Sequence, residues 1–428
     1  MKILDLSSEK KLRNVEHYYV RPNQLYHPTG KFKQDTYDIV YSNNTIDQNK
    51  FTDILLKEWF FLVKRGGYLI IDYNSNEFCN FKKLEEKMWW LWFNSYEILY
   101  HGESTQTLNT ANDIKKTIKD LRKAKRQHEV FPENYLATRF ICKKTKSTYI
   151  KDDSINKWSF GIITNGQRLD IIKKMLDAIE AQNIPYYEII ICGKYAEKLK
   201  PNMEYIEFND RSNLGWLGKK KNLVVKQAKY ENICMLHDRI ILNKDWYKGM
   251  QKWGNCFEHL GCKQLYNDER AGDWVFLDWN KGIFYPEYKS EYNFVSMLDY
   301  KDYNFNSFLG GQLHILKKSK VQQVLWNETY HWIEKQPEDV EVTFKMRDRG
   351  YIPRVNPYAT ADAINYRFGK ILERKYNEKH LGAFTNHKNV RLFGRFIIRL
   401  ASIVKLDKVL LQIFYNEKLF SFMFNAKI

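Results

Sequence analysis

The first part of the chain alternates short apolar runs with amphipathic segments. The expected strands cover residues 3–6, 37–41, 68–72 and 137–142, and the expected helices cover 51–63 and 112–128. A glycine turn at 64–67 separates the first helix from the strand that follows it. Strand, helix, glycine turn and strand in succession are typical of a parallel α/β unit. We therefore predict a small Rossmann-like α/β domain over residues 1–151, followed by a polar linker.

The second part repeats this alternation at closer spacing. The expected strands cover residues 159–164, 187–192, 203–208 and 233–236, and the expected helices cover 169–182 and 219–228. Alternating strands and helices predict a nucleotide-binding doubly wound sheet. We assign residues 157–367 to this second α/β domain.

Residues 368–428 form a third, basic region that is predicted to be helical. Between 389 and 424, Arg and Lys alternate with Leu, Ile and Phe. Two interpretations remain open. The amphipathic segment can bind an anionic membrane surface, or it can pack as a helical pair on the preceding domain.

The composition and the net charge suggest which classes of partner the protein can bind. The hydrophobic fraction of 44% is enough for a sizeable core, and the aromatic fraction of 16% suits either core packing or stacking on sugar rings. Trp274, Trp279 and Trp332 are candidates for such stacking. The net charge of +18 favours polyanionic partners, namely nucleic acid, an anionic membrane or phosphate-bearing substrates. A genome biased toward Lys, Asn and Ile codons would give the same composition.

The cysteines and apolar runs indicate a cytoplasmic protein. The 6 cysteines include no CxxC pair, so we expect neither a zinc ribbon nor a disulfide framework. The first residues, MKILDLSSEKK, lack the apolar stretch of a secretory signal. No apolar run reaches the roughly 18 residues of a membrane-spanning helix. We expect a cytoplasmic location, with peripheral attachment to the inner face of the membrane through the basic tail.

Charged residues cluster where the fourth strand of the second domain ends. The strand runs directly into His237, Asp238 and Arg239. Groups at the carboxyl ends of parallel strands face the ligand crevice of an open α/β sheet, so Thr164 and Asn165 are also expected there. The segment of three lysines that begins at Lys219 opens a helix, where amide groups and cations suit a diphosphate. A solvated basic helix face is the alternative for these lysines.

These motifs resemble those of family 2 glycosyltransferases with the GT-A fold. The resemblance rests on Asn213-Leu214-Gly215, on Lys219 to Asn222, and on the strand that ends in His237-Asp238-Arg239. It implies a mixed, mostly parallel sheet and nucleotide contacts from Asn213, Gly215, Lys219, Asn222, His237, Asp238 and Arg239. Asp238 matches the middle of the family's acidic triplet, but His237 and Arg239 stand where Asp is usual. Either Asp238 and His237 hold Mn²⁺ or Mg²⁺, or Arg239 replaces part of the metal's charge. An ordinary Asp–Arg surface ion pair is the alternative.

The same resemblance implies a catalytic base near residue 339. The helix that begins at Glu338-Asp339 resembles the family's Glu-Asp segment, so Asp339 is expected to be the base and Glu338 its neighbour or substitute. Acids in the first turn of a helix also stabilise it without any catalysis. Gly310, Gly311 and Gln312 are expected to line the donor and acceptor cleft, with a plain turn as the alternative. His387 is a further candidate metal ligand.

The first domain resembles a class I S-adenosylmethionine-dependent methyltransferase. The resemblance covers residues 37–73, with the first strand at 3–6. That family has a glycine-rich turn after the first strand, whereas this chain has Ser7-Ser8-Glu9. We therefore expect a degenerate domain that binds no S-adenosylmethionine and serves docking or acceptor recognition. An active methyltransferase, which would make the enzyme bifunctional, is the alternative.

Together these patterns predict a glycosyltransferase. It would move a sugar from a nucleotide donor, a UDP-sugar, to a hydroxyl of a glycan or lipid-linked glycan, with inversion, in the synthesis of a capsule or lipopolysaccharide. The alternatives are a transferase acting on modified nucleic acid and a noncatalytic sugar-binding or nucleotide-binding scaffold. No nucleic-acid-binding motif occurs in the sequence.

Overall fold

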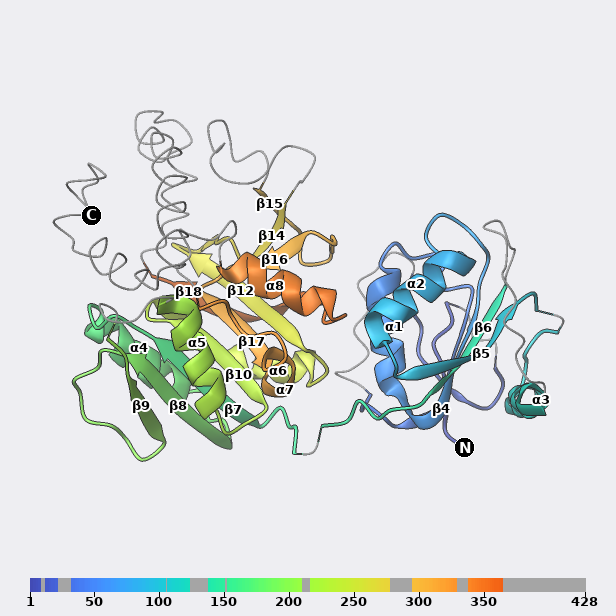
Figure 1. The fold of residues 1–428 in the computed structure, drawn as a ribbon, viewed down its shortest axis with the longest axis horizontal. Helices are drawn as coiled ribbons and strands as arrows, with labels where there is room; N and C mark the ends of the chain where they lie inside the picture. The colour runs from blue at the N-terminus through green and yellow to red at the C-terminus, as the bar shows by residue number, and fades with distance from the viewer. Residues whose placement is uncertain are drawn as a thin grey trace, which may run out of the picture. The chain divides into compact units, whose positions relative to one another are not determined.

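The computed structural model describes most of the first 364 residues. The described residues are 1–8, 12–21, 32–104, 106–123, 138–150, 152–209, 216–277, 295–328 and 338–364. The predicted basic region at 368–428, with His387, lies outside them, as do Asn213, Gly215, Trp279 and Trp332. The chain forms two compact α/β units, one built mainly from residues 1–152 and the other from residues after 152 (Figure 1).

The first unit contains one six-stranded sheet. Its strands are β1 (Ile3–Asp5), β2 (Glu16–His17), β3 (Tyr37–Asn43), β4 (Val63–Asp72), β5 (Tyr96–Gly102) and β6 (Arg139–Lys144), and its helices are α1 (Thr52–Leu62), α2 (Phe81–Trp92) and α3 (Ala111–Lys123). The order is β2-β1-β3-β4-β6-β5, in which β1 to β4 run parallel and β6 is antiparallel to both of its neighbours. The expected parallel α/β unit is confirmed.

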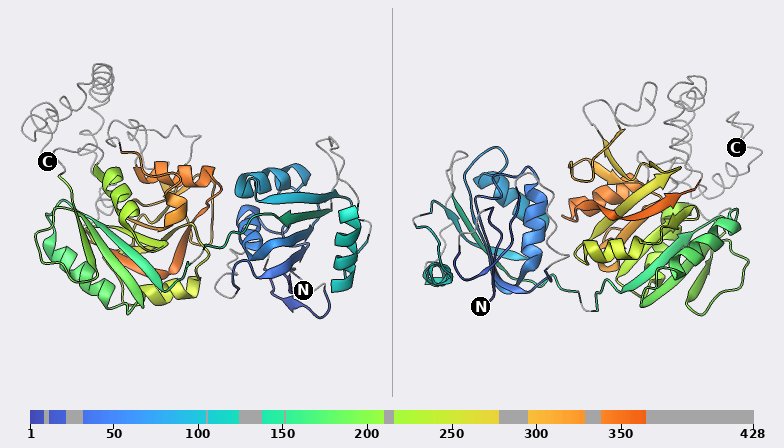
Figure 2. Two further views of the ribbon diagram at one scale, coloured as in Figure 1. Left: turned by 60° about the horizontal axis from the view of Figure 1, so that its bottom comes forward. Right: turned by 180° about the vertical axis from the view of Figure 1, so that it is seen from behind.

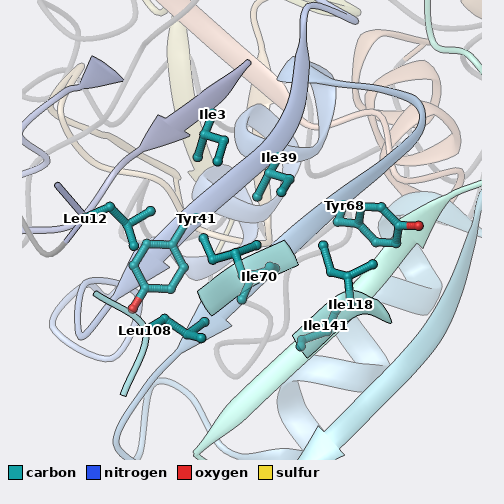
Figure 3. Close-up of a cluster of buried hydrophobic side chains, with 10 residues drawn as sticks. Ile3, Leu12, Ile39, Tyr41, Tyr68, Ile70, Leu108, Ile118 and Ile141 are labelled. Atoms are coloured by element: carbon teal, nitrogen blue, oxygen red, sulfur yellow. The ribbon is translucent and has the colours of Figure 1, made fainter. Parts of the chain in front are cut away.

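The predicted glycine turn at 64–67 is wrong. β4 begins directly after α1 and includes these residues, with Gly66 at a φ of 82°. The pairing with β3 shifts register between Tyr37 and Ile39, so the extra residues are taken up by an irregularity inside the strand. Ile39, Tyr41 and Ile70 pack with Ile118 of α3 on one face of the sheet (Figure 3).

The second unit is built on a nine-stranded mixed sheet. Its strands are β7 (Lys157–Ile163), β8 (Tyr186–Gly193), β9 (Met203–Glu207), β10 (Asn232–His237), β11 (Ile240–Leu242), β12 (His259–Tyr266), β13 (Glu269–Arg270), β17 (Leu313–Lys317) and β18 (Pro353–Ala363). The order is β11-β18-β12-β17-β10-β7-β8-β9, with β13 beside β12. β9, β8, β7, β10, β12 and β18 run in one direction, and β17, β11 and β13 run in the other. The mixed, mostly parallel sheet is confirmed.

A small antiparallel sheet and five helices complete the described part of this unit. The sheet has the order β15-β14-β16, from β14 (Trp274–Leu277), β15 (Val295–Met297) and β16 (Ser307–Leu309). The helices are α4 (Leu169–Glu180), α5 (Trp216–Gln227), α6 (Trp246–Trp253), α7 (Lys318–Val321) and α8 (Glu338–Asp348).

Alternation along β7 sets the two faces of the large sheet. Trp158 and Phe160 point to one face, where Trp246 of α6 packs against them at 5.0 Å and 5.8 Å between ring centroids. Gly161 points to the other face, where a Cβ would lie 2.3 Å from Cγ1 of Val224 in α5. Helices therefore cover both faces, with α5 on one and α4 and α6 on the other (Figure 2).

The strand order creates a topological switch point between β7 and β10. The chain leaves β7 through α4 toward β8 and β9, and then returns through α5 to β10 on the other side of β7. Ligands of open α/β sheets bind outside the carboxyl ends of the strands at such a point. A ligand site is therefore expected at the loops that follow Ile163 and His237.

Within the described residues, no helix combines the length and apolar composition needed to cross a bilayer.

Trp158→Ala is expected to destabilise the second unit by about 3–5 kcal/mol, because it leaves a cavity between β7 and α6. The free energy of unfolding from urea titrations would measure this. Tyr186→Ala is the matched control, because Tyr186 pairs near Trp158 at the start of β8 but is 57% exposed. Equal losses in both variants would contradict the assignment of Trp158 to the core.

Candidate functional site

Asp238 lies at the switch point and joins the loops after β7 and β10. One carboxylate oxygen, Oδ2, accepts a hydrogen bond from Oγ1 of Thr164 at 2.8 Å. The other, Oδ1, accepts from Nη1 of Arg168 at 2.9 Å. Asp238 is buried, whereas the Arg168 side chain is 30% exposed. Asp238 therefore binds both Thr164, directly after β7, and Arg168, directly before α4.

A glycine fixes the position of Thr164. Gly193 ends β8 with a φ of 139°, and a Cβ there would lie 1.9 Å from the carbonyl oxygen of Thr164. Only glycine fits this backbone conformation and this close approach. Asn165, the next residue in the loop, is exposed, and its Oδ1 accepts from the amide of Gln167 at 3.1 Å.

Two lysines of α5 connect the switch point with α8. Nζ of Lys220 donates to the carbonyl oxygen of Thr164 at 2.8 Å. Nζ of Lys221 donates to the carbonyl oxygen of Gly311 at 3.2 Å and to both carboxylate oxygens of Glu338 at 2.9 Å and 3.0 Å. Both lysines are buried, so they do not form a solvated face. Lys219 is partly exposed.

The two acids at the start of α8 differ in their surroundings. Glu338 is neutralised by Lys221, whereas Asp339 packs against Gly311, where a Cβ would lie 2.9 Å from its Oδ2. Burial, and then the negative charge of Glu338, raises the pKa of Asp339 to about 6, although the positive charge of Lys221 acts against this. A carboxyl group with this pKa can take up and release a proton near neutral pH. Oδ1 of Asp339 also accepts from the amide of Val340 at 2.9 Å, within the first turn of α8.

Histidines lie beside these lysines on the face that α5 covers. The amide of His237 donates to the carbonyl oxygen of Gln312 at 3.0 Å. Burial lowers the pKa of the His237 imidazole well below its usual range, and nearby positive charges lower it further. These charges are those of Lys221, Arg239, Lys220 and Arg168. Nε2 of His259 lies 2.9 Å from Nδ1 of His314, whose pKa is also lowered by burial and then by Lys221. His237, His259 and His314 are therefore uncharged near neutral pH.

Other predicted residues have mainly structural contacts. The Asn222 amide donates to the carbonyl oxygen of Trp326 at 2.8 Å and accepts from its amide at 2.9 Å. A Cβ on Gly310 would lie 2.3 Å from the carbonyl oxygen of Gly272. Trp274, expected among the candidates for sugar stacking, is buried against Leu309 and Val355 in the core.

The residues at Asp238 do not fit a divalent cation. Mg²⁺ and Mn²⁺ prefer several oxygen ligands, above all carboxylates. Both oxygens of Asp238 accept from protein donors, and one of these donors, Arg168, is positively charged. No group of three or more His, Cys, Asp or Glu residues that could hold a metal occurs in the described part of the chain.

The start of the loop after β1, where the resemblance to methyltransferases implies a glycine-rich turn, is hydrogen-bonded to the end of β3 and to the loop that follows it. Oγ of Ser7 accepts from the amide of Asn43 at 2.9 Å, and the amide of Ser8 donates to Oγ1 of Thr45 at 2.7 Å. Asp5 is fully buried beneath them and accepts from the amides of Ser7 and Leu12.

Sequence reasoning missed Arg168 and the Lys221–Glu338 pair. Arg168 carried a signal, because it follows β7 by five residues and directly precedes α4 in the loop opposite Asp238. No sequence signal pointed to the ion pair between Lys221 and Glu338, because the two residues are separated by 117 positions in the sequence.

Lys221→Met is expected to destabilise the second unit by about 3–5 kcal/mol, because it leaves the Glu338 carboxylate largely buried without a partner. Adding Glu338→Leu should restore much of this loss, since no unpaired charge then remains. Urea titrations of the two variants would measure the difference. A double variant no more stable than Lys221→Met alone would show that the charge pair is not the cause.

Comparisons with known proteins found similarity only among solved structures. No protein-family model and no curated protein matches the chain. A structure of residues 1–349 of TarS from S. aureus is 15% identical, with 56% of this chain and 72% of that chain covered and a TM-score of 0.33. The same fragment in complex with UDP-GlcNAc is 16% identical, with 56% and 73% covered and a TM-score of 0.32.

GalNAc-T7 with UDP, GalNAc and Mn²⁺ is 11% identical, with 50% of this chain and 45% of that chain covered and a TM-score of 0.33. The chain thus spans less than half of GalNAc-T7, and it spans 43% of a longer TarS chain. At these identities and TM-scores, the similarity does not support a shared activity.

Proposed function

We propose that the second unit is a glycosyltransferase of the GT-A type, similar to family 2. It would transfer a sugar from a nucleotide donor, a UDP-sugar, to a hydroxyl group of a glycan or lipid-linked glycan. One observation carries this proposal. A continuous set of contacts joins Asp238, at the carboxyl ends of β7 and β10, with Asp339 of α8. The links are Thr164, Lys220, Lys221 and Gly311.

In this proposal Asp339 is the general base. Its carboxylate takes the proton from the acceptor hydroxyl, and the acceptor oxygen forms a bond to the anomeric carbon. The bond from that carbon to the diphosphate oxygen breaks, and the electron pair leaves with the nucleoside diphosphate. Attack opposite the leaving group inverts the anomeric centre. The raised pKa of about 6 supports this role, because a base works best when its pKa lies near the working pH.

The contacts of Glu338 support a different role for it. Both of its carboxylate oxygens accept from Lys221, so both already have a partner within the protein. Glu338 is therefore the neighbour that raises the pKa of Asp339, and it does not replace it as the base.

The donor would lie at the carboxyl ends of β7 and β10. The candidates for its nucleotide and diphosphate are Thr164, Asn165, Asn213, Gly215, Lys219, Asn222, His237, Asp238 and Arg239. Gly310, Gly311 and Gln312, which precede β17, are the candidates for the donor and acceptor cleft. The contact between Gly311 and Asp339 supports this, because a side chain there would displace the base.

The first unit would serve docking or acceptor recognition without methyl transfer. The hydrogen bonds of Ser7 and Ser8 support this, because these residues stand where methyltransferases have a glycine-rich turn and are bonded to the end of β3 and the loop after it. We further propose a role in surface polysaccharide synthesis, at the inner face of the membrane. The net charge of +18 supports a phosphate-bearing or anionic partner.

The test is release of nucleoside diphosphate from a panel of UDP-sugars and GDP-sugars, with water or oligosaccharides as acceptors. Release from one donor, faster with a suitable acceptor, is the expected result. Binding of a donor without release under any condition would instead favour the noncatalytic scaffold.

Asp339→Asn is expected to lower turnover by about 10²–10⁴-fold and to leave UDP affinity unchanged, because it removes the base and keeps the shape of the side chain. Glu341→Gln is the matched control, since Glu341 belongs to the first turn of the same helix and pairs with Lys345 at the surface. Turnover would be measured by UDP release and affinity by calorimetry. Unchanged turnover in Asp339→Asn would remove it as the base.

The rate at low substrate concentration is expected to rise with pH and to level off above about 6. Only the ionised form of Asp339 accepts a proton, and its pKa is about 6. The rate should therefore fall about tenfold for each pH unit below this value. A pH–rate profile from pH 4.5 to 8 would show this. A rate independent of pH across this range would contradict the assignment.

A further inference from the structure

Arg270 lies at the carboxyl edge of the large sheet, on the side of Asp339 that faces away from Asp238. β12 runs in the same direction as β10, and β17 lies antiparallel between them. One edge of the sheet therefore holds the end of β10, the start of β17 and the end of β12. Asp238 follows β10, and Gly311, which packs against Asp339, precedes β17. The hairpin of β12 and β13, which contains Arg270, comes next along this edge.

The segment after β13 contacts the residues beside Asp339. The amide of Gly310 donates to the carbonyl oxygen of Asp273 at 3.3 Å. β14 follows Asp273 directly and packs against the start of α8 through Val275 and Val340 (Figure 1). The β12–β13 hairpin and the start of α8 therefore border the same part of the sheet edge.

Asp273 and Tyr300 hold the Arg270 side chain in place. Nε of Arg270 donates to Oδ1 of Asp273 at 2.9 Å, and Cζ of Arg270 lies 3.9 Å from the centroid of the Tyr300 ring. The Tyr300 hydroxyl donates to Oδ2 of Asp273 at 2.6 Å. The amides of Gln264 and Trp274 also donate to this carboxylate, so each of its oxygens has two donors. The guanidinium is thus fixed at one edge by an ion pair and on one face by a ring.

The far end of the Arg270 guanidinium has hydrogen-bonding capacity left. A guanidinium has five N–H donors in a planar fork, and the ion pair with Asp273 uses the one on Nε. Nη2 is buried and has no hydrogen-bond partner among the described residues, while the side chain as a whole is 24% exposed. A buried donor without an acceptor is unfavourable, so we expect an oxygen of a bound molecule to supply the acceptor.

The surroundings of Arg270 favour an uncharged oxygen. Asp273, whose side chain is fully buried, already balances the charge of the guanidinium. The two terminal nitrogens of a guanidinium lie side by side, as do the hydroxyl oxygens on neighbouring carbons of a sugar ring. Polar groups held in a fixed geometry are the usual source of specificity in small-molecule sites. The chemistry of this end of the edge therefore suits the hydroxyl groups of a sugar.

We propose that Arg270 binds the acceptor sugar by donating to a hydroxyl group other than the one that reacts. This role rests on the proposed function and names the acceptor side of the same site. The donor would lie on the Asp238 side of the base and the acceptor on the Arg270 side. Asp339 then stands between them, where a base that takes the proton from the acceptor hydroxyl is needed. Asp273 and Tyr300 are positioning residues, because they act by orienting Arg270.

Steady-state kinetics of the full chain tests this role, with the most active UDP-sugar and the best oligosaccharide acceptor of the panel. Arg270→Gln is expected to raise the KM for the acceptor by about 10–100-fold, the loss typical of a hydrogen bond to a charged group. The KM for the donor, the affinity for UDP and the hydrolysis of the donor in water should be unchanged. Lys301→Gln is the matched control, because it removes the same charge from an exposed position next to Tyr300. Equal effects of the two variants on the acceptor KM would overturn the role of Arg270.

Monodeoxy derivatives of the same acceptor separate a direct contact from a structural role. In the wild type, the derivative that lacks the bound hydroxyl should have a raised KM, because it leaves the guanidinium donor unpaired. Arg270→Gln should not discriminate against this derivative. Discrimination that persists unchanged in the variant for every derivative would overturn the contact. Arg270→Lys, which keeps a charge beside Asp273 but lacks the planar fork, replaces Arg270→Gln if thermal melting shows that the latter is not folded.

The outcomes for the acceptor site and for the donor site differ. Turnover of the donor that no uncharged oligosaccharide accelerates would overturn the role of Arg270 and leave the donor site intact. The same conclusion would follow if Arg270 affected only acceptors with a carboxylate or phosphate group. Release of nucleotide from no donor at all would overturn both the acceptor site and the proposed transferase.

Discussion

The buried ion pair between Lys221 and Glu338 is the interaction on which the candidate site depends. It fastens the start of α8 to α5, and the same ammonium group binds the carbonyl oxygen of Gly311 ahead of β17. Removing one partner alone would leave a buried charge uncompensated and so weaken the packing of these three segments. Because α5 also carries Lys220, which binds the loop after β7, this helix contacts both ends of the candidate site.

The ion pair between Lys221 and Glu338 also gives the adjacent acids Glu338 and Asp339 different environments. Glu338 pairs with Lys221, and the negative charge of Glu338 adds to burial in raising the pKa of Asp339. Two carboxyl groups next to each other in the sequence thus have different surroundings, because Glu338 is hydrogen-bonded to Lys221 whereas Asp339 packs against Gly311. Environments that push neighbouring pKa values apart are a common way to create a proton acceptor.

The two units use the carboxyl ends of their strands in opposite ways. In the second unit, the loops after β7 and β10 meet through side chains, with charged groups that stay partly exposed. In the first unit, backbone amides of Asn43 and Ser8 donate to the side-chain hydroxyls of Ser7 and Thr45, next to a fully buried acid, Asp5. Similar parallel arrangements therefore give a candidate site in one case and a closed edge in the other. The difference lies in a few side chains of the loops.

The sequence by itself determined the alternation of strands and helices, since apolar periodicity is a local property. It also determined that Asp238 follows a buried strand and that Asp339 opens a helix. The prediction of a turn at residues 64–67 was wrong. Its two glycines lie inside β4, and a shift in the register between β3 and β4 accommodates the extra residues. Only the tertiary structure decided that Arg168 meets Asp238, and that Lys221 meets Glu338 across 117 positions. Such pairs depend on strand order and helix packing, which no local pattern encodes.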